Sequence, residues 1–393
     1  MKKVLMFIPV MKGGGAERVA SLLMNEFHRN GYETEFVITS SSEKDVIRCD
    51  LNEEIPLTLS KKEKISVIYR LIGLTTSVFC RFFEKFRLDV PAFFAYLSFV
   101  SQYNSEIKQI RKILEKNPDA TGVAFLQPAI PMLMLASKGL PNRIVFSERG
   151  NPERLMKHRY GRKFIEKYYT RADAAVFQTP AAMQTYPDCV SEKGSVISNP
   201  IKPDLPNAYH NSRNKYITTF CRISAQKNLP LLFEAFNLLH KKHPDYILRI
   251  IGDAVNEEGR AIEKQLHDYI KSNDLSDCVV FEPFSSNVHE MIIGDAMYVN
   301  SSDYEGISNA MLEAMAIGMP VVCTDCPIGG ARATITDGEN GLLVPVGDVD
   351  SLYKAMKRLI EEDGLSEKLS FEAEKIRHEL SLESIAGKWM ELL

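Results

Sequence analysis

The feature that most constrains the fold is an alternation of short apolar runs with helical stretches. In the first half of the chain, the runs rich in β-branched and aromatic residues are Val4 to Pro9, Glu35 to Thr39, Gly122 to Leu126, Arg143 to Ser147, Ala174 to Gln178 and Ser195 to Ser198. Helical patterns such as Ala16 to Asn30 and Glu153 to Thr170 separate these runs. Such an alternation is typical of a parallel sheet with crossover helices. It predicts a doubly wound α/β domain.

The alternation stops at a polar, proline-rich segment, NPIKPDLPNAYHNSRNK (199–215), and then starts again. The new runs are YITTFCRI, YILRIIGD, CVVFEPF, AMYVNSS, MPVVCTD and NGLLVPV, and each leads into a helical pattern. A chain of 393 residues is also too long for one ordinary core. We therefore predict an α/β fold with two Rossmann-like domains, 1–200 and 201–380, and a ligand site in a cleft at the carboxyl ends of their strands. A last helical stretch, 381–393, is compatible with either half.

Composition and charge narrow the class of protein. The formal net charge of -3 provides no general attraction to nucleic acid. The seven cysteines are odd in number and scattered through apolar runs, which predicts reduced core residues and a cytoplasmic protein. The opening MKKVLMFIPVMKGGG has an apolar run of strand length and no cleavage site, so it is interpreted as the first strand.

Residues 61–116 interrupt the regular spacing of the first half. On a helical wheel one side collects Ile65, Ile68, Ile72, Phe79, Phe83 and Phe86, and the other collects Arg70, Ser77 and Arg81. The segment has eleven Lys and Arg but five Asp and Glu, and its charges disfavour a membrane-spanning helix. Two interpretations stay open: helices packed on the domain's own core, or a basic amphipathic arm that lies on anionic lipid.

A glycine triplet follows the first strand. Gly13, Gly14 and Gly15 open the helix from Ala16, so backbone N–H groups at the positive helix end would face a phosphate or an acceptor hydroxyl. The triplet does not match the dinucleotide-binding pattern GxGxxG. A plain tight turn would explain it equally simply.

Two cations follow the first strand of the second half. Arg222 and Lys227 lie where the chain turns from this strand into a helix. Two cations at a helix N-terminus and a strand's carboxyl end form a clamp suited to a diphosphate. Considered alone, the pair would more simply be two solvated surface cations.

A pair of acids strengthens the diphosphate interpretation. Strand AMYVNSS leads, at the same edge of the sheet, to Glu305, Gly306 and then Glu313. We expect both acids on one amphipathic helical run, two turns apart, so that one holds a transferred sugar and the other a ribose diol. N–H groups and small polar side chains at the helix start would come from Ile307, Ser308 and Asn309. The simpler alternative is one acid favoured by the helix dipole and one exposed glutamate.

Other motifs have simpler explanations. Asp348 and Asp350 match the DxD pattern of some metal-dependent nucleotide-sugar enzymes, but helix capping explains both acids. Cys323 and Cys326 form a lone CxxC without a second pair. We therefore expect no metal and no cofactor.

The motifs together resemble a known family. The residues that carry the resemblance are Arg222, Lys227-Asn228, the E-x7-E pair in SDYEGISNAMLEAMAIGMPVVCTD, the later GENGLLVPVGD and the early GGGAERV. They resemble the family 4 retaining glycosyltransferases, in particular the bacterial branch that builds polysaccharides and lipid-linked oligosaccharides. The resemblance covers nearly the whole chain and is densest from 215 to 350.

The resemblance implies a GT-B fold, with the acceptor on the N-terminal domain, the donor nucleotide on the C-terminal one, and the final helix, 381–393, crossing back. Arg222 and Lys227 would hold the donor diphosphate, and Glu305 would contact the transferred sugar. Glu313 would bind the ribose, and donor contacts would also come from Gly14, Gly15 and 306–309. No metal is implied. Where many relatives carry an acceptor-side histidine, this chain has Glu148 and Arg149, and His158 lies further on.

The function expected is retaining transfer of a hexose or N-acetylhexosamine from a nucleotide-diphosphate sugar to a hydroxyl of a lipid-linked or growing glycan. UDP-sugars are favoured over GDP-sugars. The site of action would be the inner face of the cytoplasmic membrane, with 61–116 as a possible contact to anionic lipid. Two alternatives are an epimerase or hydrolase of nucleotide-sugars, and an inactive subunit that only binds them.

Overall fold

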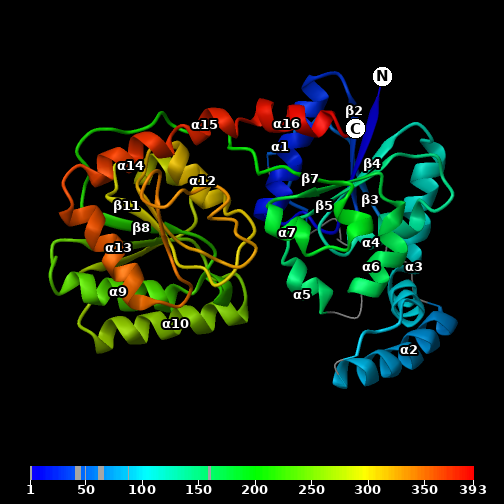
Figure 1. The fold of residues 1–393 in the computed structure, drawn as a ribbon, viewed down its shortest axis with the longest axis horizontal. Helices are drawn as coiled ribbons and strands as arrows, with labels where there is room; N and C mark the ends of the chain where they lie inside the picture. Colours follow the sequence, from blue (N-terminus) through cyan, green and yellow to red (C-terminus); the bar gives the residue numbers. More distant parts are fainter. Residues whose placement is uncertain (1, 40–45, 49, 61–65, 87, 158–160) are drawn as a thin grey trace. The chain divides into compact units, whose positions relative to one another are not determined.

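The computed structural model describes residues 2–39, 46–48, 50–60, 66–86, 88–157 and 161–393. The chain divides into two compact units (Figure 1). Unit 1 consists of residues 1–200 together with 382–393, and unit 2 consists of residues 201–381. The last helix therefore belongs to unit 1, although unit 2 precedes it in the chain.

Unit 1 contains a seven-stranded parallel sheet with the order β3-β2-β1-β4-β5-β6-β7. Its strands are β1 Lys3–Ile8, β2 Glu33–Ile38, β3 Leu57–Leu59, β4 Thr121–Phe125, β5 Ile144–Glu148, β6 Ala174–Phe177 and β7 Gly194–Val196. All six predicted strands are confirmed with small shifts of their ends. The prediction missed β3 because its three half-buried residues carry no pattern.

The helices of unit 1 connect these strands. They are α1 Gly15–Arg29, α2 Val67–Lys85, α3 Ala92–Lys116, α4 Ala129–Ala136, α5 Pro152–Met156, α6 Arg162–Tyr168, α7 Pro180–Gln184, α8 Asp188–Ser191 and α16 Leu382–Met390, with a 3-10 turn, η2, at Tyr169–Arg171. The prediction of one helix from Glu153 to Thr170 was wrong, since α5 ends at Met156 and α6 begins at Arg162.

Unit 2 contains a six-stranded parallel sheet with the order β10-β9-β8-β11-β12-β13. Its strands are β8 Tyr216–Phe220, β9 Ile247–Ile251, β10 Val279–Glu282, β11 Met297–Asn300, β12 Val321–Thr324 and β13 Leu342–Val344. Its helices are α9 Leu229–His240, α10 Glu257–Ser272, α11 Val288–Ile292, α12 Asn309–Ala316, α13 Val349–Glu361, α14 Leu365–Ala373 and α15 Ile376–Glu379, with a 3-10 turn, η3, at Ala225–Lys227. The predicted second alternation is confirmed.

Hydrophobic side chains cover both faces of the unit 2 sheet. Tyr298 of β11 packs into a cluster with α11, α12 and α15, while its neighbours Met297 and Val299 pack into another with α9, α10 and α13. Adjacent residues of a strand point to opposite faces, so the two clusters lie on the two sides of the sheet. Only the strand ends remain available for a ligand.

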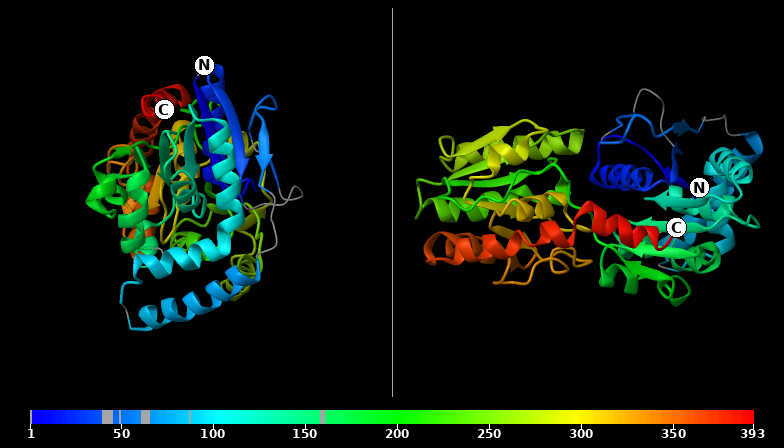
Figure 2. Two further views of the ribbon diagram at one scale, coloured as in Figure 1. Left: turned by 90° about the vertical axis from the view of Figure 1, so that its right-hand side faces the viewer. Right: turned by 90° about the horizontal axis from the view of Figure 1, so that it is seen from above.

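An arm of two helices extends from unit 1, formed by α2 and α3 (Figure 2). Along their contact, Phe79 stacks on Phe94 with ring centroids 5.1 Å apart, and Gly73 leaves no room for a Cβ beside Ser101. Among the described residues no helix is long and apolar enough to cross a membrane. Ile65, which the helical wheel included, lies outside the described residues.

The helix α16 closes the core of unit 1. Trp389 is fully buried and stacks on Phe125 at the end of β4, with ring centroids 5.5 Å apart. Beyond the helix, the carbonyl of Leu392 accepts a hydrogen bond of 2.7 Å from Arg143 Nε. The start of β5 and the end of β4 are thus both tied to residues that follow unit 2.

Candidate active site

The loop after β8 carries the two predicted cations. Arg222 is exposed and, among the described residues, makes no hydrogen bond or ion pair. Lys227 ends η3, and the next residue, Asn228, has a positive φ of 40°. The Asn228 side chain caps α9 by accepting a hydrogen bond from the N–H of Leu231. The loop therefore ends where α9 begins, as the motif predicted.

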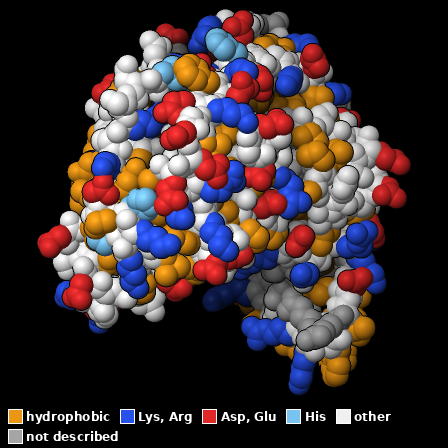
Figure 3. Space-filling model, turned by 60° about the vertical axis from the view of Figure 1, so that its left-hand side comes forward, with side chains coloured by type: hydrophobic (Ala, Val, Ile, Leu, Met, Phe, Trp, Pro, Cys, Tyr) orange, Lys and Arg blue, Asp and Glu red, His pale blue; other side chains and the backbone are white. Residues whose placement is uncertain are grey.

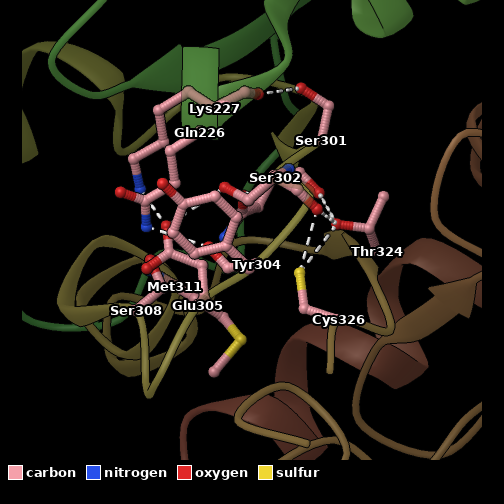
Figure 4. A network of polar contacts seen from close by, with 11 residues as sticks. Gln226, Lys227, Ser301, Ser302, Tyr304, Glu305, Ser308, Met311, Thr324 and Cys326 are labelled. Atoms are coloured by element: carbon pink, nitrogen blue, oxygen red, sulfur yellow. Dashed lines mark hydrogen bonds and ion pairs between the residues drawn. The ribbon is translucent and has the colours of Figure 1, made fainter. Parts of the chain in front are cut away.

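Lys227 and Glu305 meet at the carboxyl edge of the unit 2 sheet (Figure 4). The Lys227 ammonium contacts Glu305 Oε1, and Ser302 Oγ lies 3.0 Å from the same oxygen. Both charged side chains are largely buried, with 19% and 14% of their surfaces exposed. The pair brings together the loops that follow β8 and β11, which are neighbouring strands of the sheet.

Backbone and side-chain hydrogen bonds join the same two loops. Asp303 donates its N–H to the carbonyl of Gln226 at 2.9 Å, and Asn228 Nδ2 donates to Asp303 Oδ1 at 2.7 Å. Ser301 Oγ donates to the carbonyl of Lys227 at 2.9 Å. The charged pair therefore lies on a scaffold that is tied together independently of the pair itself.

Two opposing effects act on the pKa of Lys227. Burial by itself lowers this pKa, because the protein interior solvates an ammonium poorly. The attraction and hydrogen bond of Glu305 outweigh burial, so the net pKa is raised above its ordinary value of 10.5. Lys227 is thus positively charged at neutral pH, and the pair is an ion pair.

Glycines allow close backbone approaches around these loops. A Cβ added at Gly330 would lie 1.4 Å from the carbonyl oxygen of Gly306, and one added at Gly252 would lie 2.1 Å from that of Cys221. The loop of Arg222 therefore packs directly on the backbone of Gly252, and the loop of Glu305 packs directly on the backbone of Gly330. Sequence reasoning missed Gly330 and Gly252, because no local pattern connects them with loops so far away in the chain.

One prediction for this loop was wrong. Glu305 and Glu313 do not share a helix, because α12 begins at Asn309 and its N-cap is Ser308. The Ser308 side chain accepts a hydrogen bond from the N–H of Met311 at 3.4 Å, and Ser308 is a favoured capping residue. Only Glu313 is helical, whereas Glu305 belongs to the preceding loop. Ile307 is buried behind it.

Glu313 is buried beside a histidine that sequence reasoning missed. His289 Nε2 of α11 lies 2.8 Å from Glu313 Oε2, and both residues are less than a tenth exposed. The simpler alternative for Glu313, an exposed glutamate, was therefore wrong. His289 has no motif of its own and precedes Glu313 by 24 positions, so no local signal points to it.

The glycine loop of unit 1 is occupied by a carboxylate of its own helix. Glu17 Oε2 accepts hydrogen bonds from the N–H groups of Gly14, at 2.9 Å, and Lys12. The expectation of a free N–H at Gly14 was wrong, since the Glu17 side chain accepts from this N–H, which is the half of a capping box that a glycine N-cap can form. A phosphate at this turn would meet a negative charge. Gly15 is the first residue of α1.

Glu148 and Arg149 lie at the end of β5 and are both buried. Glu148 accepts hydrogen bonds from the N–H of Gly150 at 2.8 Å and from Tyr186 Oη at 2.8 Å. Arg149 Nε donates to Ser147 Oγ at 2.8 Å, and its guanidinium lies over the ring of Phe125, 4.9 Å from the centroid.

The charge of Arg149 has an unusual setting. Burial lowers its pKa to about 9, partly opposed by Glu148, so the side chain remains protonated at neutral pH. Its Nη2 is buried without a hydrogen-bond partner in the described part of the chain. Trp389 of α16 also lies beside the guanidinium, 5.8 Å from ring centroid to Cζ. The nearby histidine, His158, lies outside the described residues.

The acidic and cysteine motifs have structural roles. Asp348 caps α13, with its Oδ1 accepting from the N–H of Ser351 at 2.9 Å. Cys326 Sγ donates to the carbonyl of Ser302 at 2.9 Å, and burial raises the pKa of its thiol to about 11. Within the described ranges, no cluster of three or more His, Cys, Asp or Glu side chains is arranged to hold a metal.

Two units that each contain a wound parallel sheet are the architecture of the GT-B fold. Anabaena Alr3699/HepE, solved in complex with UDP, has the same fold: it superposes with a TM-score of 0.77 and 18% identity over 100% of this chain and 99% of that chain. The predicted GT-B fold is confirmed.

Residues 203–376 match the family described as "Glycosyl transferases group 1". An "Uncharacterized glycosyltransferase" of Haemophilus influenzae is 25% identical over the whole of both chains. The N-acetylgalactosamine-N,N'-diacetylbacillosaminyl-diphospho-undecaprenol 4-alpha-N-acetylgalactosaminyltransferase of Campylobacter jejuni is 28% identical over 63% of this chain and 68% of its own. The resemblance to family 4 glycosyltransferases is therefore confirmed.

Proposed function

We propose that the protein is a retaining, metal-independent hexosyltransferase of polysaccharide biosynthesis. It transfers a hexose or an N-acetylhexosamine from a nucleotide-diphosphate sugar to a hydroxyl of a lipid-linked or growing glycan. UDP-sugars are the first choice of donor, and GDP-sugars the second. The acceptor class is favoured by the Campylobacter relative, whose name specifies a diphospho-undecaprenol substrate. Such an acceptor would place the enzyme at the inner face of the cytoplasmic membrane.

The observation that carries the proposal is the ion pair of Lys227 and Glu305 at the carboxyl edge of the unit 2 sheet. Parallel α/β sheets bind nucleotides at this edge. In the proposed complex, Arg222 and Lys227 hold the donor diphosphate, and Glu305 contacts the transferred sugar. Glu313 takes the ribose hydroxyls.

The chemistry asked of these residues is mainly electrostatic. When the bond between the anomeric carbon and the diphosphate breaks, negative charge grows on the leaving phosphate oxygens. Two side chains supply positive charge for these oxygens. Arg222 is exposed and has no ion pair in the described part of the chain, and Lys227 is already held in place by Glu305. A preorganised cation of this kind does not have to reorganise during the reaction.

Unit 1 contributes the acceptor side in this proposal. Its candidates are Glu148 and Arg149, and the buried Nη2 of Arg149 lacks a partner among the described residues. The role of Gly14 and Gly15 changes with the structure. Because Glu17 occupies the Gly14 N–H, we propose that this loop approaches an acceptor hydroxyl and does not bind a phosphate.

Calorimetric binding of UDP-, GDP-, ADP- and dTDP-sugars, with and without EDTA, tests the donor and the metal independence. Micromolar binding of one nucleotide that survives EDTA and is lost in Lys227→Ala and Glu313→Ala would support the proposal. Binding that EDTA abolishes would overturn the metal independence. Binding that both variants retain would overturn the site.

Turnover separates the remaining alternatives. Donor conversion in the absence of any acceptor would indicate an epimerase or a hydrolase. Donor binding without conversion, over a panel of lipid-diphosphate glycan acceptors, would indicate an inactive binding subunit. Proton NMR of the new glycosidic bond reports whether the anomeric configuration is retained.

A further inference from the structure

The helix α2 has two different faces. One face packs on α3 and contains Gly73, Thr76 and Cys80, of which Thr76 and Cys80 are buried. The opposite face carries large apolar side chains that are mostly exposed, namely Val67, Ile68, Leu71, Leu74, Val78 and Phe82. Leu74 and Val78, near its middle, are 65% and 66% exposed.

This exposed face overlaps only in part with the side that the helical wheel collected. Of the wheel's residues, Ile68, Phe79 and Phe86 are more than half exposed, whereas Ile72 and Phe83 are only half-exposed. The apolar surface continues past the end of α2 through Phe86, Leu88 and Phe93, each more than half exposed. A contiguous apolar surface of this kind is unusual for a protein that functions alone in water.

Basic side chains border the exposed face. Arg70, Arg81 and Lys85 are exposed on α2, and the helix contains a single acid, Glu84. At about 100° per residue, Arg70 and Arg81 lie along one margin of the apolar stripe, beside Leu74. Figure 3 shows orange and blue side chains together on the projecting arm.

We propose that this face of α2, the apolar stripe with Arg70, Arg81 and Lys85, docks on the anionic surface of a lipid bilayer. The apolar side chains enter the boundary between headgroups and acyl chains, and the cations contact the phosphate layer. Since the described residues include no helix able to span a membrane, α2 lies along the surface. The lipid-linked acceptor rests on the function proposed above, but the docking surface itself does not.

Charge favours a bilayer over a second copy of the chain. Two copies that met through this face would bring two sets of three cations close together, with one acid on each helix to offset them. An anionic leaflet supplies the opposite charge along the whole length of the helix. It also accepts apolar side chains without requiring a complementary shape.

The test is flotation of the full chain with vesicles of phosphatidylcholine, with or without phosphatidylglycerol. We expect binding to vesicles that contain phosphatidylglycerol, and weaker binding at high salt. The variant Arg70→Gln/Arg81→Gln should lower the partition coefficient about 30-fold, since each basic residue near the surface is worth about a fivefold change. Leu74→Ser/Val78→Ser/Phe82→Ser should abolish binding.

Matched controls lie on unit 2. Lys264→Gln/Lys271→Gln removes two exposed charges of α10, and Val255→Ser/Phe284→Ser removes two exposed apolar side chains. Both controls should bind vesicles as the parent does. The altered side chains are exposed and do not form the core, so we expect every variant to fold. Circular dichroism and thermal unfolding check this.

Three outcomes would overturn the proposal: no binding to anionic vesicles, equal binding by the α2 variants, or a dimer in sedimentation that only the α2 variants dissociate. Turnover of a water-soluble acceptor analogue separates this proposal from the catalytic one. If the parent chain binds vesicles but does not turn over this analogue, only the proposed catalytic function is contradicted. Normal turnover without vesicle binding contradicts the docking surface only.

Discussion

Lys227 and Glu305 form a largely buried ion pair although 78 positions separate them in the chain. Their loops follow β8 and β11, which are neighbours in the sheet but not consecutive in sequence. The pair leaves one exposed cation, Arg222, on the same loop. A donor diphosphate would therefore meet a site whose local charges are already partly balanced.

Removing either charge of this pair should be costly. We expect Lys227→Ala and Glu305→Ala each to lower turnover by about two orders of magnitude, the scale expected when one preorganised electrostatic interaction is removed from the transition state. The double variant should lose less than the sum of the two, because the residues interact directly. Initial rates with the identified donor provide the measurement.

The matched control for this pair is Lys357 with Glu361, a more exposed pair on α13 with Nζ and Oε2 3.0 Å apart and 32% and 43% of their side chains exposed. Lys357→Ala and Glu361→Ala should leave turnover unchanged, since exposed pairs of this kind contribute little. Parental activity in both Lys227→Ala and Glu305→Ala would contradict the assignment of this site.

Stability should depend on Lys227 only below alkaline pH. The folded pKa is raised above the ordinary value of 10.5, so the contribution of the ion pair is fully present below that pH. It is lost as the pH rises through the higher folded value. Urea unfolding should show a constant difference between the parent and Lys227→Met from neutral pH to 10.5, and a shrinking one above it. A difference that grows with pH would contradict this account.

Gly330 should be intolerant of a side chain. A Cβ there would lie 1.4 Å from the Gly306 carbonyl, so Gly330→Ala must displace the loop that holds Glu305. We expect a loss of about two orders of magnitude in kcat/KM, the usual result of misplacing a catalytic group by about 1 Å. Gly294→Ala is the control, because its nearest neighbour is Tyr209 Cζ at 3.8 Å, an ordinary van der Waals distance. Equal kinetics in the two variants would refute the prediction.

His289 should act as a positioning residue for Glu313. Because the two side chains are 2.8 Å apart and buried, His289→Ala should remove a buried hydrogen bond that orients the Glu313 carboxylate. The donor KM should rise about tenfold, equivalent to about 1.4 kcal/mol, with kcat nearly unchanged. His289→Gln, which keeps a donor, should recover part of the affinity. A fall in kcat at constant KM would instead indicate a role in chemistry.

Glu17 should stabilise unit 1 through its capping box. Its carboxylate satisfies the N–H groups of Lys12 and Gly14, so Glu17→Ala should lower the free energy of unfolding by about 1 kcal/mol. Glu257→Ala in the first turn of α10 is the control, because Asn256 caps that helix. Urea midpoints measure both variants, and equal midpoints would show that the box contributes nothing.

The sheets could be predicted because parallel strands buried on both faces consist of apolar runs. Each of the six runs in unit 1 contains a strand, whereas the short β3 has no run to reveal it. Arg222, Lys227 and Glu305 could be placed at one edge by the rule that parallel strands end together. The direct contact of Lys227 with Glu305 could not be predicted, because it depends on which strands are neighbours.

Other features of the site were not predicted, for different reasons. The occupation of Gly14 had a local signal, an acid three residues after the N-cap, which is the spacing of a capping box. Gly330 and His289 had none, since each contacts a residue that is remote in sequence. The sequence left the exposed face of α2 open, because a helix with apolar residues on two sides does not reveal which side packs inward.

Trp389 has a consequence for the order in which the protein is made. Because α16 belongs to unit 1 but follows unit 2 in the chain, the ribosome completes unit 2 before it supplies the tryptophan that covers Phe125. The core of the half that is translated first can therefore be completed only after the other half has been translated. While unit 2 is synthesised, Arg149 and Phe125 lack their contacts with Trp389. A nascent chain stalled before residue 382 therefore has a unit 1 core without α16.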